Sequence, residues 1–306
     1  MDTCALCGER AVLQMSHILP SFVFAWMKRT SATGHIRFGM APNRRVQDGL
    51  KVPLLGECCE QRIASWEKEF AERVFHPIHD ADVYEGFGPS PASPIEYGPW
   101  LLKFAVSVSW RSLVFVLRSR GIPEGVTDSL RPKVAAAEAI WREFLLNERP
   151  NPAQYEQHMV LFGPIEHTTL KIPSNMNRYL LRAPEIDIVF TSKSVFIYSK
   201  LCRAVVFGFI EMPQAKKWTG TKLHVNAGRV PDGRIFMDQA VIDYMMARAR
   251  RLEDLTQSMS PAQRQRIEDA FKRDPNRVLS SDSVRARNAD IELHAKRLSS
   301  SERPSY

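Results

Sequence analysis

The stretch CALCG, residues 4–8, places two cysteines three positions apart and follows them with a glycine. Two thiolates at this spacing can bind one metal ion on a tight turn, with zinc–sulfur distances of about 2.3 Å. One such pair supplies only half of a tetrahedral site. A second pair, Cys58 and Cys59, follows in LLGECCE, residues 54–60. We therefore predict a structural zinc site formed by Cys4, Cys7, Cys58 and Cys59.

Between the two cysteine pairs lies SHILP, residues 16–20. The order CxxC, SHILP, CCE resembles that of HNH endonucleases, the zinc-bearing His-Me finger family. The resemblance covers residues 1–75 and implies a treble clef that carries a ββα-metal site. The matching positions are Cys4 and Cys7, His17 with Pro20, Asn43 or Asp48, Leu54 with Leu55, and Cys59 with Glu60. The longer string from SHILPSF to WEKEFA is also similar to a group of uncharacterised bacterial HNH-like proteins.

The resemblance implies a metal-dependent nuclease site. His17 would be the general base that takes a proton from water. Asn43 or Asp48 would orient His17 or complete the metal shell, and Glu60 occupies the position of a metal ligand. A single Mg²⁺ or Mn²⁺ ion would polarise the scissile phosphate and stabilise the leaving oxygen. Catalysis is therefore expected from His17, Asn43, Asp48 and Glu60.

Two positions depart from the family pattern. Gly56 stands where the family has a cysteine, which leaves the fourth zinc ligand open between Cys58, His76 and water. Ser16 stands where many active members have Asp or His, and a hydroxyl is a poor ligand for Mg²⁺. These departures favour an alternative, a non-catalytic treble-clef module that binds nucleic acid or a protein without turnover. In a third interpretation the chain is a metal-free α+β interaction protein whose cysteines are ordinary reduced thiols.

The segment between the cysteine pairs is basic. Residues 28–51 hold six basic side chains against the single acid Asp48, a net charge of +5. Neutralising nucleic-acid phosphates needs such a surface. We expect DNA to be the partner, contacted by Lys28, Arg29, Arg37, Arg44, Arg45 and Lys51.

Beyond this module the sequence predicts a larger α+β domain. Residues 86–99 are rich in proline and glycine and are typical of a linker. Residues 99–118 and 133–147 predict helices, and the β-branched and aromatic runs at 158–162, 186–190, 195–198, 205–210, 223–226 and 234–237 predict strands. Asp238 and Ser260 are predicted to cap two further helices. The predicted organisation is a module at 1–85, a linker at 86–99, an α+β domain at 100–298 that recognises the target or a protein partner, and a polar tail at 299–306.

The composition is that of an ordinary soluble protein. Of the 306 residues, 44% are hydrophobic and 25% charged, which excludes a disordered chain, a fibrous repeat and a multi-span membrane protein. The formal net charge of +8 permits a polyanionic partner. The first residues lack the pattern of a secretory signal, so we expect a cytoplasmic location without a membrane partner.

Overall fold

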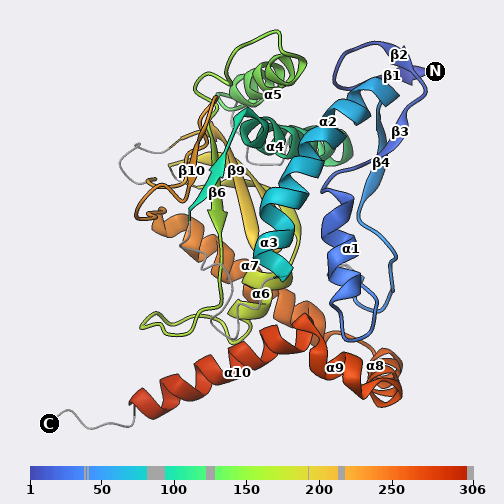
Figure 1. Cartoon of the computed structure of the whole chain (residues 1–306), viewed down its shortest axis with the longest axis vertical. Helices are drawn as coiled ribbons and strands as arrows, with labels where there is room; N and C mark the ends of the chain where they lie inside the picture. Colours follow the sequence, from blue (N-terminus) through green and yellow to red (C-terminus); the bar gives the residue numbers. More distant parts are fainter. Residues whose placement is uncertain are drawn as a thin grey trace, which may run out of the picture.

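The fold combines helices with antiparallel sheet, as the sequence predicts. The computed structural model describes residues 1–37, 39, 41–80, 94–121, 128–191, 193–212 and 218–301. Most of the predicted linker, residues 86–93, and the last five residues of the predicted tail lie outside this part. Figure 1 shows the helices packed around a central sheet.

The N-terminal part is built from two short antiparallel ladders and a long helix. Strand β1 (Asp2–Thr3) pairs with β2 (Arg10–Ala11), and β3 (Gln14–His17) pairs with β4 (Lys51–Leu55). Helix α1 (Ser21–Arg29) follows β3 after Pro20, and α2 (Glu57–Phe70) begins directly after β4. A π-helical turn η1 (Ala71–Phe75) continues α2 into α3 (His76–Asp80). The CxxC turn thus joins β1 to β2, and α2 follows the second ladder.

The centre of the molecule is a four-stranded sheet in the order β6-β9-β8-β7, with every neighbouring pair antiparallel. Its strands are β6 (Gln157–Leu161), β7 (Glu185–Phe190), β8 (Val195–Leu201) and β9 (Ala204–Glu211). Side chains alternate between its two faces. Along β8, Ile197 joins one core with α4 (Pro99–Arg120) and α5 (Arg131–Leu146). Its neighbour Phe196 joins the other core with α6 (Met176–Arg182) and α7 (Gln239–Gln257).

Two predicted strands are wrong. Residues 223–226 and 234–237 form no strand, and only single bridges at Lys222 and Phe236 remain nearby. The sequence prediction missed β5 (Ile95–Tyr97), within the predicted linker, and its partner β10 (Gly228–Val230). These strands are too short for a β-rich run to stand out.

The N-terminal part and the sheet region share one hydrophobic core, which runs from Cys4 to Val230. Helices α2 and α4 meet in this core, where the rings of Phe70 and Phe104 stack with centroids 3.9 Å apart. Helix α4 is long and apolar enough to cross a membrane, but 78% of its apolar window is buried by the rest of the protein. Such burial is expected of the core helix of a soluble protein.

Three C-terminal helices, α8 (Pro261–Arg273), α9 (Pro275–Ser280) and α10 (Asp282–Ser301), complete the chain. The predicted caps are confirmed: Asp238 accepts from the Ala240 N–H at the start of α7, and Ser260 from the Gln263 N–H at the start of α8. Figure 1 shows α8 and α9 beside the end of α1. Elements from the first and the last third of the sequence therefore lie side by side at this edge.

The side chain of Arg111 joins α4 to the N-terminal module, so its replacement should strongly lower the stability of the fold. Its side chain is 1% exposed, and its guanidinium pairs with Glu67 at 2.5 Å and donates to the His17 carbonyl at 2.8 Å. Arg111→Met leaves a half-buried carboxylate without its cation, so we expect a loss of about 3–5 kcal/mol in the free energy of unfolding. Urea denaturation measures this change in the free energy of unfolding. The double variant Arg111→Met/Glu67→Gln should recover part of the loss, and a double variant as unstable as the single one would contradict this assignment.

Candidate functional site

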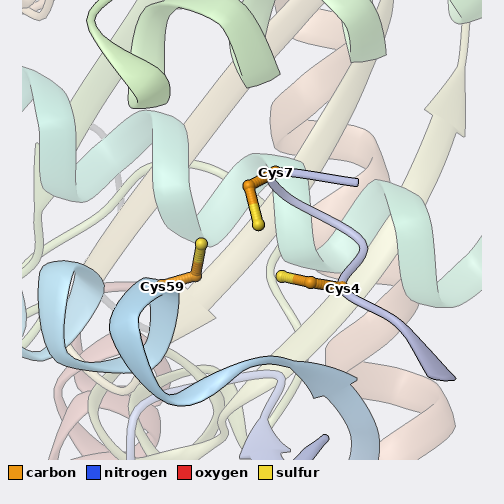
Figure 2. Close-up of side chains that lie close together, drawn as sticks. All are labelled: Cys4, Cys7 and Cys59. Atoms are coloured by element: carbon orange, nitrogen blue, oxygen red, sulfur yellow. The ribbon is translucent and has the colours of Figure 1, made fainter. Parts of the chain in front are cut away.

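Three of the four predicted zinc ligands lie together. The Sγ atoms of Cys4, Cys7 and Cys59 are all within 4.8 Å of one another and could hold a metal ion. Cys4 and Cys7 come from the turn between β1 and β2, while Cys59 comes from the first turn of α2; Figure 2 shows the three sulfurs converging. Gly8 makes this turn possible, because its φ of 78° lies in the left-handed region that favours glycine.

The electrostatics of the cluster suit a cation. Burial alone would raise the pKa of Cys4, but the backbone N–H groups of Cys7, Gly56 and Leu6 point at its sulfur and lower the pKa overall. Burial, together with the neighbouring thiols of Cys7 and Cys4, raises the pKa of Cys59 to about 12. Metal binding requires deprotonated thiols. A bound cation is therefore what would let all three sulfurs ionise together.

The fourth predicted ligand, Cys58, is not part of this cluster. Its side chain is exposed, because on a helix it points away from the direction of Cys59. The alternative ligand His76 lies on α3 with its Nδ1 3.3 Å from an Asp80 carboxylate oxygen. A Cβ atom built on Gly56 would lie 3.9 Å from the Cβ of Cys4, so the family's missing cysteine position does border the cluster. In the part of the chain that the structure describes, the metal-binding group has three protein ligands.

His17 ends strand β3 and faces Asp48. Its Nε2 lies 3.1 Å from Oδ2 of Asp48, and the same oxygen is 2.7 Å from the Lys51 ammonium. Burial by itself would raise the pKa of Asp48, but contacts with Lys51, the Gly49 N–H and His17 lower the pKa to about 2. The structure thus brings together His17 and Asp48, two of the predicted catalytic residues, and uses Lys51 as the partner of Asp48.

The lowered pKa of Asp48 predicts a pH dependence of stability. A folded-state pKa of about 2 against an ordinary value of 3.8 means that ionised Asp48 stabilises the fold above about pH 4. This contribution should disappear as the pH falls from 4 to 2. Asp48→Asn should flatten the dependence of the urea midpoint on pH in that window, and an unchanged dependence would contradict it. The size is modest, because the carboxylate is 36% exposed.

Ser16 and Glu60 form the second pair at this site. Ser16 is completely buried, and its hydroxyl donates to Oε2 of Glu60 at 2.7 Å. Serine therefore serves here as a hydrogen-bond donor to the carboxylate on α2. Outside the cysteine cluster, the described residues include no group of three His, Cys, Asp or Glu ligand atoms within 4.8 Å of one another. Among the described residues, Glu60 is thus not part of a group of three such ligands.

Asn43 does not orient His17. Its side-chain oxygen accepts from the Ser260 N–H at 2.8 Å, which ties the basic segment to the start of α8. Of the two residues, Asp48 is the one that lies beside His17. The ion pair of Arg111 with Glu67 was not identified from the sequence. A signal was present, because Arg111 lies in a nearly all-apolar helix and a buried arginine needs a partner.

The six predicted phosphate-binding residues divide into two sets. Lys51 pairs with Asp48, and Arg29 pairs with Asp80 at 2.7 Å. Arg44 and Arg45 are exposed, and Arg37 is half-buried. In residues 28–37 and 41–51, no carboxylate pairs with Arg37, Arg44, Arg45 or Lys28. These four remain available for an anionic partner.

Comparison with known proteins gave no match: no family model, curated protein or solved structure is similar to this chain.

Proposed function

We propose that residues 1–75 form an HNH-like module and that the protein is a metal-dependent endonuclease that hydrolyses phosphodiester bonds in DNA, in the cytoplasm. The observation that carries this proposal is the proximity of His17 and Asp48, whose Nε2 and Oδ2 atoms lie 3.1 Å apart beside the ladder of β3 and β4. An ionised carboxylate beside a histidine stabilises the protonated form that a general base acquires. The adjacent arginines offer charges for phosphate.

The module would use two metals with different tasks. Zinc, held by Cys4, Cys7 and Cys59, would fix the CxxC turn against α2. Glu60 would offer a carboxylate to Mg²⁺ or Mn²⁺, which commonly binds through one or two carboxylates plus substrate phosphate oxygens. When bound, this ion supplies charge stabilisation for the scissile phosphate. The protein's own part is to position His17 and to hold the DNA.

The test is conversion of supercoiled plasmid to nicked or linear forms by the wild-type protein. We expect conversion with Mg²⁺ or Mn²⁺ and none in EDTA. Absence of conversion by a folded, metal-loaded protein under both conditions, on plasmid and on single-stranded DNA, would overturn the nuclease proposal.

The hydrogen bond between Ser16 and Glu60 supports a second candidate, a binding module without turnover. Ser16 and Glu60 stand at the two positions at which active HNH members are expected to bind the catalytic metal, and here the two side chains bind each other. In this case the protein would bind nucleic acid or a protein partner in a salt-sensitive way, without cleavage.

Ser16→Asp distinguishes the two candidates. It places a second carboxylate beside Glu60, so we expect the variant to melt below wild type in EDTA and to be stabilised by Mn²⁺ more than wild type. Differential scanning fluorimetry measures both effects. If wild type cleaves DNA, the variant should cleave at lower metal concentration. DNA cleavage by the variant but not by wild type would favour the binding module for the natural protein. A melting temperature of the variant that does not change with Mn²⁺ would contradict the assigned metal position.

A further inference from the structure

The basic segment contains a short hairpin whose arginines face each other. Val46 donates its N–H to the Ile36 carbonyl at 3.0 Å, and these two residues form an antiparallel bridge. Ile36 belongs to the core and Val46 packs against it. Because side chains alternate along extended chains, the flanking Arg37 and Arg45 share the other side and oppose each other. Like charges in directly opposed positions are destabilising unless something neutralises them.

Among the described residues, two donor atoms of Arg37 have no hydrogen-bond partner. Its Nε and Nη2 atoms are buried without a hydrogen-bond partner, and so is Nδ1 of the nearby His35. Burial and then Arg45 lower the pKa of Arg37. Buried donors almost always find a partner, and a charged donor left without one is costly. Arg37, Arg45 and His35 therefore have the composition of a site whose ligand is an anion.

The C-terminal helices fix this segment in place. The Arg277 guanidinium donates to the carbonyls of Ser31, at 3.0 Å, and Lys28, at 3.1 Å. The Ala32 N–H donates to the Ser283 hydroxyl at 3.0 Å. After burial, the charges of Arg45, Arg37 and Arg277 lower the pKa of His35, so the four side chains share one positive field. A segment anchored at these points can hold its arginines ready for a ligand.

We propose that His35, Arg37 and Arg45 form a binding site for a phosphate group of a DNA strand. Guanidinium groups match the tetrahedral oxyanion with two parallel donors, and Arg37 offers a free pair. Arg45 and Asp48 are three positions apart, so their Cα atoms are at most about 11 Å apart. A strand held here would pass close to His17. The identity of the phosphate as that of DNA rests on the proposed function, whereas the anion site itself does not depend on catalysis.

The experiment compares two neighbouring arginines. Fluorescence anisotropy with a short labelled DNA duplex, in EDTA so that no cleavage occurs, gives the affinity of wild type, Arg45→Gln and the matched control Arg44→Gln. We expect Arg45→Gln to weaken binding about tenfold and to reduce the salt slope by about one. Arg44 is also expected to contact DNA, but it does not oppose Arg37, so its replacement should weaken binding clearly less than that of Arg45, by about twofold. Circular dichroism melts confirm that both variants fold.

A second measurement separates the sources of phosphate. Inorganic phosphate at constant ionic strength should raise the melting temperature of wild type and not that of Arg45→Gln. The substitution removes one of the charges that bind phosphate, and it also removes the repulsion between Arg37 and Arg45 that a bound phosphate would relieve. Equal losses of DNA affinity in both variants, or no loss in either, would overturn the proposal. Stabilisation by phosphate without any DNA binding would overturn its assignment to DNA. If the protein binds the duplex through Arg45 but never nicks plasmid, the phosphate site is supported and the nuclease proposal is wrong.

Discussion

Cys59→Ser is expected to abolish metal binding and to unfold the N-terminal module. The substitution leaves two thiolates, Cys4 and Cys7, which cannot hold a structural zinc ion. Structural zinc contributes an apparent 10 kcal/mol or more to folding in small zinc domains, roughly the whole stability of a domain of this kind. The cluster borders the core that also holds α4, so the loss should reach the rest of the protein. We expect a fall of at least about 10 °C in the melting temperature.

Elemental analysis and thermal melts of the purified protein check this result. The matched control is Cys58→Ser, the adjacent cysteine, which is exposed and lies outside the cluster. It should keep about one zinc ion per chain and melt like wild type. A Cys58→Ser protein that loses its zinc would show that Cys58 is a ligand, and wild type without zinc would favour the metal-free interpretation.

His17→Ala is expected to reduce plasmid nicking by at least about a hundredfold, the usual contribution of a general base. The backbone of His17 is held independently of its ring, because the carbonyl accepts from Arg111 and β3 pairs with β4. The variant should therefore fold, bind DNA in EDTA and fail only in turnover. Initial rates at saturating Mn²⁺, with contaminating nuclease excluded by a mock purification, give the ratio.

His76→Ala is the control for this experiment. His76 also pairs with an aspartate, with its Nδ1 3.3 Å from Oδ2 of Asp80, but it lies on α3 and not on the strand that carries His17. It should nick at the wild-type rate. A His17→Ala protein that nicks as fast as His76→Ala would remove His17 as the base, even if the protein is a nuclease.

The local features of the fold could be predicted from sequence because their causes are local. The CxxC turn, the apolar helix of α4 and the caps at Asp238 and Ser260 each depend on a few neighbouring residues. The central strands were found for the same reason, since β-branched and aromatic residues make up most of β7, β8 and β9. The short β5 and β10 have no such composition and exist only through pairing with each other.

The site was less predictable because its decisive contacts join distant positions. The spacing of motifs could not choose between Asn43 and Asp48 as the partner of His17; the choice depends on how the segment folds back, which Ser260 helps to fix. Glu67 on α2 pairs with Arg111 from α4, a contact between positions 44 residues apart. The family pattern marks Ser16 only as the place of a missing metal ligand, and it does not predict that its hydroxyl donates a hydrogen bond to Glu60.

The anchoring of the basic segment by α9 and α10 has a consequence for synthesis. The hydrogen bond between Ala32 and Ser283 joins positions 251 residues apart, and the contacts of Arg277 span almost as many. Translation proceeds from the N-terminus, and N-terminal parts fold first. The cysteine turn and α2 can therefore associate early on the ribosome, while the basic segment waits for nearly the entire chain. A nascent chain would carry the cysteine cluster long before the basic segment is anchored, so the phosphate site proposed above would form only late in synthesis.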